Sequence, residues 1–518
     1  MDIRDYMAKA LLYYPNNTAL VYKDTRMTTR EVVERIYRVA NALLTLGLEK
    51  GDRVGVLLHN CHQCVECFFG IQCAGLVLVP LNARNSAEEH RYMLENSETK
   101  ALLFGEEFSQ GVDSIRPGLK DLTFTIKVTG QSSSEHIDYE ALMADASTQV
   151  PEVEIEDTDI GSLRYTSGTT GKPKGVIHHQ GSYLVMVSNI LTSGFSIEEG
   201  DSIALMGPVT HASGSMILPH ILKGATVYIL TRFDADEILE LIQKERITTL
   251  YLVPTMIVML LNHPKVKDHD LSSLKTIRYG ASPIAPDVLK RAIDIFGNVF
   301  IQGYGLTEGS MPVTILTKKD HVLDGSEKSL KRLLSVGRET FSARVAIMDD
   351  EGRILPPGEI GEIVIRSKQC MKGYWKNPEA TEAAFRHGWM HTRDMGYQDE
   401  EGYIYLVDRK EDMIISGGFN VYPKEVEDVL YKHSAVLEAA VFGVPDEVWG
   451  EAVKAVVSLR KGAEASSDSI IEFCKQYLAG YKKPKTVDFV DELPKTAVGK
   501  ISRRMLKEPY WQDRMRRV

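Results

Sequence analysis

A ten-residue stretch of this chain, Thr166 to Gly175, combines the residue types that bind phosphate. It contains four hydroxyl side chains, three glycines and two lysines. Glycines let backbone N–H groups close on an anion, and hydroxyls and lysines add donors and positive charge. A polar hairpin is the alternative interpretation. The stretch is not a Walker A loop, because Thr166 stands where that motif needs its first glycine, so transfer of a γ-phosphoryl group is not implied.

Seven later segments hold further glycines, hydroxyls or titratable side chains. They are Pro208–Gly214, Tyr279–Pro283, Gln302–Glu308, His391–Gly396 followed by Asp408–Arg409, Ser416–Asn420 and Pro494–Lys500. The stretch Thr166–Gly175 resembles the phosphate-binding loop of the adenylate-forming superfamily, which includes acyl-CoA synthetases, the adenylation domains of peptide synthetases and firefly luciferase. The seven later segments resemble the other motifs of that superfamily, in the same order and at similar spacing, so the resemblance covers nearly the whole chain.

The resemblance implies a reaction in two steps. In the first step a substrate carboxylate attacks the α-phosphorus of ATP and expels pyrophosphate, so neutralising charge is the main demand on the site. By resemblance, Lys500 would bridge the carboxylate and the α-phosphate, and His211 would lie near the acyl carboxylate. Glu308, with Thr307 beside it, would hold Mg²⁺, an ion that prefers hard oxygen ligands.

The ATP contacts that the resemblance implies come from many parts of the chain. Tyr304 would stack on adenine, Asp394 would accept from both ribose hydroxyls, and Arg409 would be a second ribose contact. Together the expected ATP-binding residues are Thr166, Ser167, Gly168, Thr169, Thr170, Gly171, Lys174, Gly280, Ala281, Ser282, Gln302, Gly303, Tyr304, Gly305, Thr307, Asp394, Arg409 and Lys500.

In the second implied step a thiol, that of CoA, attacks the acyl-adenylate. The family's small C-terminal domain rotates between the steps, and the matching hinge position here is Glu411, where the family commonly has Asp or Lys. Gly417, Gly418 and Phe419 match the loop that lines the path of the thiol. Glycine suits that loop because it lets a slender pantetheine chain pass close to the backbone.

The acid itself is not named by the sequence. The expected pocket is small and mildly apolar, which suits an aromatic acid or a fatty chain, and its residues are Ser213, Gly214, Ile217, Tyr279, Gly280 and Gly305. Arg232 and His220 are candidates for meeting a second carboxylate, with a structural role as the alternative.

Three other functions compete with that of an acyl- or aryl-CoA ligase. One is a stand-alone adenylation enzyme that loads an acyl group onto a carrier protein. Adenylation domains for amino acids generally place an Asp after the histidine motif, whereas Ser213 to Met216 follow His211 here and cannot pair with an ammonium. A luciferase-like oxygenation has no feature in its favour that the ligase lacks. The presence of Lys500, Glu308 and Asp394 argues against a catalytically inactive binding protein.

The elements that must position these residues follow an alternating pattern. Strand-like runs are Asp52–Leu58, Val77–Leu81, Ser162–Tyr165, Val176–His179, Ala225–Leu230, Thr249–Val253 and Thr276–Tyr279, and helical patterns include Cys61–Ala74 and Ala235–Glu245. Such alternation predicts α/β layers with buried sheets. Two hydrophilic stretches, Gly130–Glu135 and the lysine-rich Leu316–Leu334, are predicted to be surface loops.

The length of 518 residues predicts at least two domains. Five charged residues in a row, Asp408–Asp412, favour a boundary there, because the following residues have their own strands at Val436–Gly443 and Ala452–Leu459. We therefore expect an α/β fold with a large N-terminal domain of several subdomains, residues 1–410. A small mobile α+β C-terminal domain, residues 411–518, would carry the catalytic lysine and the thiol-path loop.

Composition limits the cellular setting and the partners. The net charge of −10 argues against bulk nucleic-acid binding, although eleven Lys/Arg against five Asp/Glu after Gly480 could meet the phosphates of ATP or CoA. No apolar run is long enough to span a bilayer, and the N-terminus lacks the pattern of a signal peptide. A cytoplasmic protein acting on ATP, CoA and a small carboxylic acid is expected. Dimers are common in the family, so a homodimer is one expected assembly.

The cysteines offer an apparent metal motif. Cys61, Cys64 and Cys67 have the spacing of an iron–sulfur run. They fall in a segment of helical period, where side chains at i, i+3 and i+6 rotate progressively around the axis and do not converge on one ion. Packing as small apolar side chains is therefore the favoured interpretation.

Overall fold

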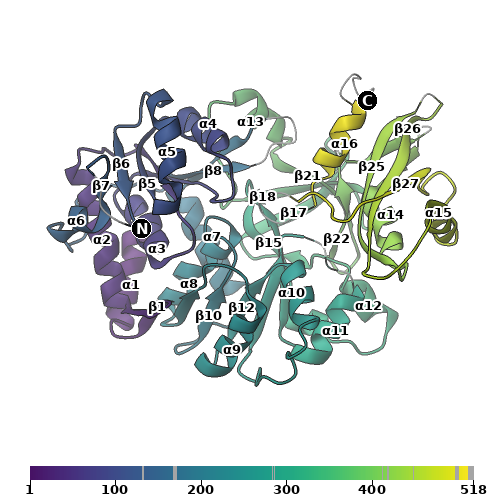
Figure 1. Ribbon diagram of the computed structural model, residues 1–518, viewed down its shortest axis with the longest axis horizontal. Coiled ribbons are helices and arrows are strands. Elements are labelled where there is room, and N and C mark those ends of the chain that lie inside the picture. Colours follow the sequence, from purple (N-terminus) through teal and green to yellow (C-terminus); the bar gives the residue numbers. More distant parts are fainter. Residues whose placement is uncertain are drawn as a thin grey trace. The chain divides into compact units, whose positions relative to one another are not determined.

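The computed structural model describes residues 1–130, 134–166, 172–282, 284, 286–410, 412–416, 419–446, 448–495 and 501–511. The chain divides into two compact units (Figure 1). The first contains Met1–Val345 and Ile365–Met390, and the second contains Ala346–Val364 and His391–Val518. Residues 391–410 thus group with the C-terminal part, whereas the predicted boundary after residue 410 stays a prediction.

The first unit contains an eight-stranded sheet that carries the phosphate-loop hairpin near one edge. In spatial order its strands are β19 (Gly373–Tyr374), β9 (Lys174–His179), β8 (Ile160–Thr166), β4 (Val77–Pro80), β3 (Arg53–Leu57), β5 (Thr99–Phe104), β6 (Phe124–Lys127) and β7 (Ile137–Asp138). The pairs from β8 to β7 are parallel, whereas β9 and β19 are antiparallel.

A nine-stranded sheet of the same unit carries the later motifs. Its order is β16 (Arg338–Glu339), β15 (Ser310–Leu316), β14 (Phe300–Leu306), β13 (Thr276–Gly280), β12 (Thr249–Leu252), β10 (Ser202–Leu205), β11 (Thr226–Ile229), β1 (Thr18–Tyr22) and β2 (Thr25–Thr28). The strands from β14 to β1 pair in parallel. Because carboxyl ends of parallel strands share one edge, the segments that follow β13 and β14 are neighbours.

Helices cover both faces of each sheet, as buried parallel strands require. The inner core cluster joins residues of both sheets to α1 (Ile3–Tyr13), α2 (Thr29–Thr45), α3 (His62–Cys73), α6 (Tyr139–Ala144), α7 (Gln180–Thr192) and α8 (Ile217–Leu222). The other face of the eight-stranded sheet packs on α4 (Ala87–Ser97) and α5 (Ser109–Ile115). The other face of the nine-stranded sheet packs on α9 (Ala235–Glu245), α10 (Pro254–Leu261) and α11 (Pro286–Phe296).

Local sequence explains where several of these helices begin. Thr28 and Glu31 form a reciprocal capping box at α2, and Ser86 and Glu89 form another at α4. Every predicted strand named above in this unit is present, with ends that differ by one or two residues, and both predicted helices are confirmed as α3 and α9.

The second unit has a mixed sheet with helices packed against it. The strand order is β24 (Phe419–Val421), β23 (Ile414–Ser416), β26 (Gly450–Leu459) and β25 (Val436–Asp446), and β27 (Thr486–Phe489) pairs with β26 in parallel. Its core includes residues of α14 (Pro423–Leu430) and α15 (Ser467–Lys475), while α16 (Arg503–Trp511) adds Leu506 to a smaller cluster. The predicted strands at 436–443 and 452–459 are confirmed.

A further five-stranded sheet carries the predicted ribose contacts. It has the order β17 (Ala343–Met348), β18 (Gly361–Ser367), β21 (Trp389–Gln398) and β20 (Phe385–Arg386), with β22 (Ile404–Arg409) paired to β21. A short helix, α13 (Pro378–Ala384), precedes β20. The α/β class with a smaller C-terminal part is therefore confirmed.

The prediction of a surface loop at Leu316–Leu334 is wrong. This segment contains the 3-10 helix η4 (Lys318–His321) and the helix α12 (Glu327–Arg332). The imidazole of His321 is fully buried and lies 2.9 Å from the hydroxyl of Tyr279. Lysine content suggested a loop, whereas the caps at Thr317 and Ser326 start helical turns. Of the other predicted loop, residues 131–133 lie outside the described part.

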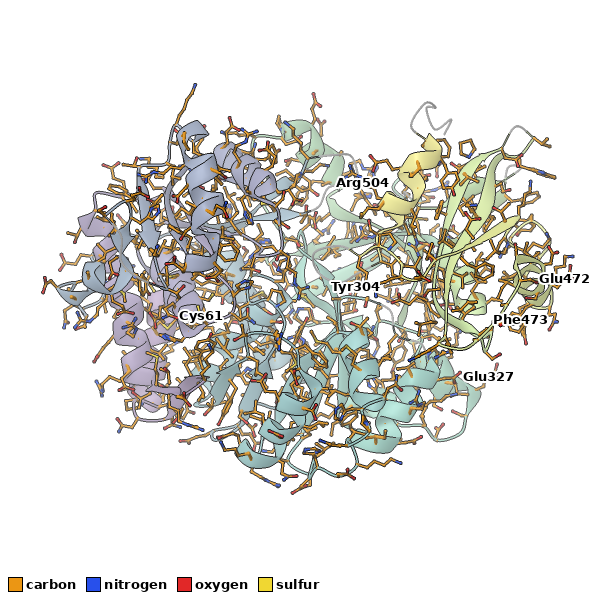
Figure 2. All side chains as sticks on the ribbon, in the orientation of Figure 1. Cys61, Tyr304, Glu327, Glu472, Phe473 and Arg504 are labelled. Carbon is orange, nitrogen blue, oxygen red and sulfur yellow. The ribbon has the colours of Figure 1, made fainter. Side chains whose placement is uncertain are left out.

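The cysteine segment is the buried helix α3. Cys61, labelled in Figure 2, precedes its first turn, and Cys64 and Cys67 lie in the inner core cluster. Burial raises the pKa of the Cys67 thiol well above its usual range. These thiols pack as small apolar groups. None of the helices in the described ranges combines the length and apolarity needed to cross a membrane.

Candidate active site

The hairpin of β8 and β9 presents the phosphate loop. Thr166 and Lys174 are the last paired residues of the two strands. The base of the hairpin is held by the backbone N–H of Trp375, which donates to the Gly175 carbonyl at 2.7 Å, and by the Tyr165 hydroxyl, which donates to Asn96 at 2.7 Å. Of the expected ATP contacts, Ser167, Gly168, Thr169, Thr170 and Gly171 lie outside the described residues.

Glu308, the expected magnesium ligand, is connected to this hairpin through a tyrosine. It follows β14, and its Oε1 accepts a hydrogen bond from the Tyr374 hydroxyl at 3.0 Å. The ammonium of Lys174 lies 5.2 Å from the centroid of the Tyr374 ring. Tyr374 pairs with Val176 through β19, so it connects the hairpin to Glu308. Sequence reasoning missed this tyrosine, which the spacing of charged residues does not reveal.

A second link joins the same two segments on the other side of the strand. The Nδ1 atom of His178, on β9, lies 3.4 Å from the hydroxyl of Ser310, which follows Glu308 closely in the sequence. Burial, together with the charge of Arg164, lowers the pKa of His178 to about 3, so the imidazole is neutral near pH 7. The hairpin and the turn after β14 are thus fixed to each other by neutral groups.

The expected adenine-side residues lie on β13 and β14. Gly280 and Gly303 are paired partners, and a Cβ on Gly280 would stand 2.4 Å from the Gly303 carbonyl oxygen, so only glycine fits. The next residue, Ala281, has a φ of +68° and is exposed. Tyr304, labelled in Figure 2, is largely buried on β14. Gln302, Gly305, Thr307 and Ser282 are on or beside these strand ends.

The histidine motif is linked to the hairpin through a partly buried arginine, Arg164. Arg164 of β8 donates from Nη1 to the Thr210 carbonyl at 3.0 Å. The Thr210 hydroxyl lies 2.8 Å from His211 Nδ1. The 3-10 helix η3 (Ala212–Met216) begins directly after this histidine and holds Ser213 and Gly214, and Ile217 starts α8. Arg164 thus ties β8 to the expected acyl-carboxylate region.

The expected acyl-pocket residues do not all face the same side of the nine-stranded sheet. The Tyr279 side chain belongs to the outer cluster with α9 to α11, and its hydroxyl meets His321. Its neighbour Arg278 faces the opposite way, because side chains alternate along a strand, and its guanidinium contacts Met216. Sequence reasoning missed Arg278, although a single charge within the apolar strand Thr276–Gly280 was a signal.

The two candidates for a second carboxylate differ in exposure. Arg232 is exposed after β11, whereas His220 is fully buried in α8. His220 Nδ1 lies 2.7 Å from the Met216 carbonyl. Because a carbonyl only accepts, Nδ1 carries the proton and Nε2 is left as an acceptor. Burial lowers the pKa of His220 to about 4, so this neutral ring is not an anion-binding group.

The predicted ribose contacts pair with each other in the second unit. Asp394 and Arg409 are opposite residues on β21 and β22, and Arg409 Nε lies 2.6 Å from Asp394 Oδ1. Arg393, directly before Asp394, has a φ of +63°, a conformation that non-glycine residues seldom adopt. The backbone N–H of Asp394 donates to the Thr392 hydroxyl at 3.0 Å. Asp394 is therefore buried and held in position, with the Arg409 side chain partly exposed.

A carboxylate cluster surrounds Arg503 beside the predicted hinge. Arg503 donates to Glu427 at 2.6 Å, to Asp412 at 3.0 Å and to Asp408 at 3.4 Å. Burial raises the pKa of Asp408 to about 6, against the lowering effect of Arg503. The cluster joins residues on both sides of Glu411 to α16. Glu411 and Lys500 themselves lie outside the described residues.

A surface of aromatic and lysine side chains lies beside the predicted thiol path. Ser416 pairs with Phe419 on one side and with Gly450 on the other, so Phe419 and Trp449 flank the same strand end. The Phe419 ring lies 4.8 Å from that of Tyr481, and the Lys485 ammonium lies 4.9 Å from the Trp449 ring. We call Phe419, Trp449, Tyr481, Lys482 and Lys485 the aromatic–lysine patch. Gly417 and Gly418 lie outside the described residues.

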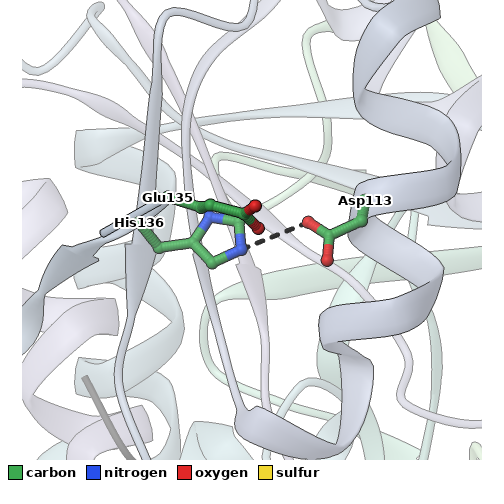
Figure 3. A group of neighbouring side chains, drawn as sticks. All are labelled: Asp113, Glu135 and His136. Atoms are coloured by element: carbon green, nitrogen blue, oxygen red, sulfur yellow. Dashed lines mark ion pairs between the residues drawn. The ribbon is translucent and has the colours of Figure 1, made fainter. Parts of the chain in front are cut away.

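A group with metal-ligand chemistry lies in the first unit, outside the expected site. Asp113, Glu135 and His136 gather between α5 and β7 (Figure 3). His136 Nε2 lies 3.2 Å from Asp113, and Nδ1 lies 3.0 Å from the Thr125 hydroxyl. Both ring nitrogens of His136 therefore have protein partners. A structural role, in which the histidine connects α5 to β6, accounts for its position.

The sequence also matches known families. The model of the AMP-binding enzymes matches residues 8–375, and that of the AMP-binding enzyme C-terminal domain matches residues 425–500. A medium/long-chain-fatty-acid–CoA ligase of Mycobacterium tuberculosis is 36% identical, over 98% of this chain and 90% of its own length. A fatty acid–[acyl-carrier-protein] ligase of Streptomyces coeruleorubidus is 34% identical, over 97% of this chain and 95% of its own length.

Solved structures agree with this assignment. An anthranilate CoA ligase in complex with anthranoyl-AMP superposes with a TM-score of 0.88 at 29% identity, covering 98% of this chain and 97% of that one. The fold and the motifs define an adenylate-forming enzyme. The chain belongs to the AMP-binding enzyme family, in its acyl-CoA synthetase branch, and is an acid–thiol ligase whose substrates are a small carboxylic acid, ATP and CoA.

Proposed function

We propose that the enzyme activates an aromatic or medium- to long-chain fatty acid as an acyl-adenylate and transfers the acyl group to CoA. A carboxylate oxygen forms a bond to the α-phosphorus of ATP, and the bond between the α-phosphorus and the bridging oxygen breaks to release pyrophosphate. The CoA sulfur then bonds to the acyl carbon, and AMP leaves.

The observation that carries the proposal is the contact between the phosphate-loop hairpin and Glu308. Tyr374 donates to Glu308 Oε1 and lies under the Lys174 ammonium. Lys174 and Glu308 thus contact the same tyrosine and do not pair with each other. Lys174 can therefore bind a phosphate, and Glu308 can bind a cation. Among the described residues, Glu308 has no ion-pair partner, and its oxygen chemistry fits Mg²⁺. When bound, the ion would supply positive charge to the triphosphate.

The remaining roles follow the family resemblance. Asp394 would accept from the ribose hydroxyls, Arg409 would add a second contact, and Tyr304 would stack on adenine. Lys500 would neutralise the charge that develops between carboxylate and α-phosphate. His211 would orient the carboxylate, with Thr210 fixing its ring. The residues that this reaction requires are divided between the two units.

The first half-reaction tests the role of Lys500. Lys500→Ala is expected to lower acid-dependent ATP–pyrophosphate exchange by about a hundredfold or more. It should leave thioester formation from chemically prepared acyl-adenylate within about threefold of wild type, because that step needs no lysine at the α-phosphate. Lys495→Ala is the matched control, since that ammonium pairs with Glu438 at 3.0 Å. An equal loss in both half-reactions would contradict the assigned role.

The second half-reaction tests the thiol path. Gly418→Leu is expected to spare pyrophosphate exchange and to slow thioester formation by about a hundredfold, because a side chain would narrow the passage for pantetheine. Full-rate thioester formation by this variant would rule out the path at Gly417 and Gly418.

A carrier protein is the alternative acceptor, favoured by the relative that acts on an acyl carrier protein. Both acceptors end in pantetheine, but only CoA adds an adenine and a 3′-phosphate. The aromatic–lysine patch favours CoA, because its exposed aromatic faces can stack on the adenine base. Comparing CoA, dephospho-CoA and a pantetheine-loaded carrier protein as acceptors tests this choice. We expect CoA to have the highest kcat/KM, and Trp449→Ala to remove most of that preference. A preference for the carrier protein would select the alternative.

A further inference from the structure

Arg278 is a fully buried cation in the first unit. Its side chain is among the largest with less than 2% exposure. The guanidinium lies between two aromatic rings, 4.7 Å from the centroid of Phe195 and 5.3 Å from that of Tyr251. Aromatic faces attract a cation, but they do not replace the hydrogen bonds that its N–H groups make in water.

The hydrogen bonds of Arg278 are incomplete. Nη1 points at the Met216 sulfur, a weak acceptor, whereas Nε and Nη2 have no partner among the described residues. These two nitrogens form one edge of the guanidinium and hold their N–H bonds parallel, which is the arrangement that binds both oxygens of one carboxylate. Burial lowers the pKa of Arg278, yet arginine stays charged at any physiological pH.

The position of Arg278 relates it to the acid. Met216, which it contacts, ends η3, and that helix begins directly after His211. Five residues of 3-10 helix rise about 10 Å, so Met216 lies about that far along η3 from the expected carboxylate end. Arg278 Nη2 is also 3.3 Å from where a Cβ on Gly303 would stand. The arginine therefore meets two of the segments expected to contact the acid.

We propose that Arg278 binds a second carboxylate at the far end of the substrate, so that the enzyme acts on dicarboxylic acids, either extended aliphatic or aromatic. This inference rests on the proposed function, because it concerns the acid that is adenylated. A buried cation without an anion is unfavourable, whereas a side-on carboxylate would satisfy both free N–H groups. His220 cannot serve in its place, since its Nε2 is an acceptor and its ring is neutral.

The experiment compares matched pairs of acids in the full enzyme. Each pair consists of a dicarboxylic acid and the acid of equal length in which a methyl group replaces the far carboxylate. One set of pairs is aliphatic and the other is aromatic. The measurement is kcat/KM for AMP release with saturating ATP and CoA. Wild type is expected to prefer the best diacid over its methyl partner by about a hundredfold, the scale of losing a buried charge-assisted pair.

Two variants separate binding from structure. Arg278→Met keeps an unbranched apolar side chain and is expected to invert the preference, lowering kcat/KM for the diacid by about a hundredfold or more while the methyl acid gains. Arg30→Met removes an exposed arginine of α2, outside the expected acid pocket, and should leave the preference as in wild type. Arg278→Lys should retain part of the preference, since a lysine keeps the charge but loses the two-pronged geometry.

The outcomes distinguish this inference from the function on which it rests. If wild type releases AMP with methyl acids and not with diacids, the enzyme is a ligase and the inference is wrong. The inference is also wrong if Arg278→Met lowers kcat/KM equally for both members of a pair. If no acid in either series supports AMP release while ATP–pyrophosphate exchange is also absent, the proposed function fails first.

Discussion

Arg503 and Arg278 are two arginines withdrawn from solvent, and they are held in opposite ways. Arg503, whose side chain is 22% exposed, faces the carboxylates of Glu427, Asp408 and Asp412. Burial lowers the pKa of Arg503, but the carboxylates of Glu427 and Asp408 raise that pKa above its usual range. Arg278 is more deeply buried, meets no carboxylate among the described residues, and has its pKa lowered by burial.

The difference separates a structural charge from one available to a ligand. A cation that stabilises the fold is surrounded by anions, because an uncompensated buried charge costs free energy. Glu308 resembles Arg278 in this respect, since in the described part of the chain its carboxylate is held by a neutral tyrosine and not by a cation. Arg278 and Glu308 are therefore two charged groups of the expected substrate site that lack an opposite charge among the described residues.

Removing Arg503 should have the largest effect on stability. Arg503→Met leaves up to three carboxylates without their cation, so we expect the free energy of unfolding of the C-terminal unit to fall by about 3 to 5 kcal/mol. Chemical denaturation followed by the fluorescence of the tryptophans measures this. The control is Arg460→Met, an exposed arginine of the same unit, for which a change of at most about 0.5 kcal/mol is expected. Equal losses in the two variants would remove the contrast with Arg278.

The pH dependence of stability should report on Asp408, one partner of Arg503. Its pKa is raised to about 6 in the folded chain from 3.8. The folded state therefore binds the proton more tightly, and the stability from this group is present at low pH and lost as pH rises through about 6. Asp408→Asn removes the titration, so wild type should lose up to about 3 kcal/mol relative to the variant between pH 4 and 7. A difference that stays constant over this range would contradict the shift.

Removing Arg278 should change stability in the opposite direction. Arg278→Met replaces a buried cation without an anion by an apolar side chain, so we expect the free energy of unfolding in the absence of substrate to rise by about 1 kcal/mol. Urea denaturation of the first unit measures it, with Arg30→Met as the matched exposed control. A loss of about 3 kcal/mol or more would mean that Arg278 stabilises the fold, as Arg503 does.

The smallest expected effect is that of removing the hydroxyl of Tyr374, the neutral partner of Glu308. Tyr374→Phe removes one hydrogen bond, worth about 1 kcal/mol, so we expect the KM for Mg²⁺-ATP to rise about fivefold with little change in stability. Tyr477→Phe, an exposed tyrosine of the second unit, is the control. An unchanged KM in Tyr374→Phe would show that Glu308 does not depend on this contact.

Much of the fold could be predicted from the sequence because its signals are local. Buried parallel strands are short β-branched runs, and the capping boxes at Thr28 and Ser86 mark helix starts. The prediction of a loop at Leu316–Leu334 is wrong partly for a tertiary reason, since the buried His321 packs against Tyr279 and Phe300. The sequence alone could not show that tertiary packing overrides the polar composition.

The site residues that belong to a sequence motif could be predicted. The site residues that contact each other across a long sequence separation could not. Gly280 is required by the carbonyl of Gly303, and each of these glycines stands in one of the two motifs Tyr279–Pro283 and Gln302–Glu308. Tyr374 meets Glu308 across 66 positions of sequence, and no local pattern links them. The opposite orientations of Arg278 and Tyr279 depend on the register of β13, because a shift of one residue exchanges the two faces.

The buried cysteines make this enzyme convenient to assay and to probe. Only a thiolate reacts quickly with disulfide reagents, and burial raises the pKa of Cys73 above its usual range and that of Cys474 to about 11. A thiol-reactive dye should therefore report the consumption of CoA with little background from the native protein. Cys474 is the one cysteine of the C-terminal unit. Its rate of alkylation would then measure how often that unit opens, independently of the cysteines in α3.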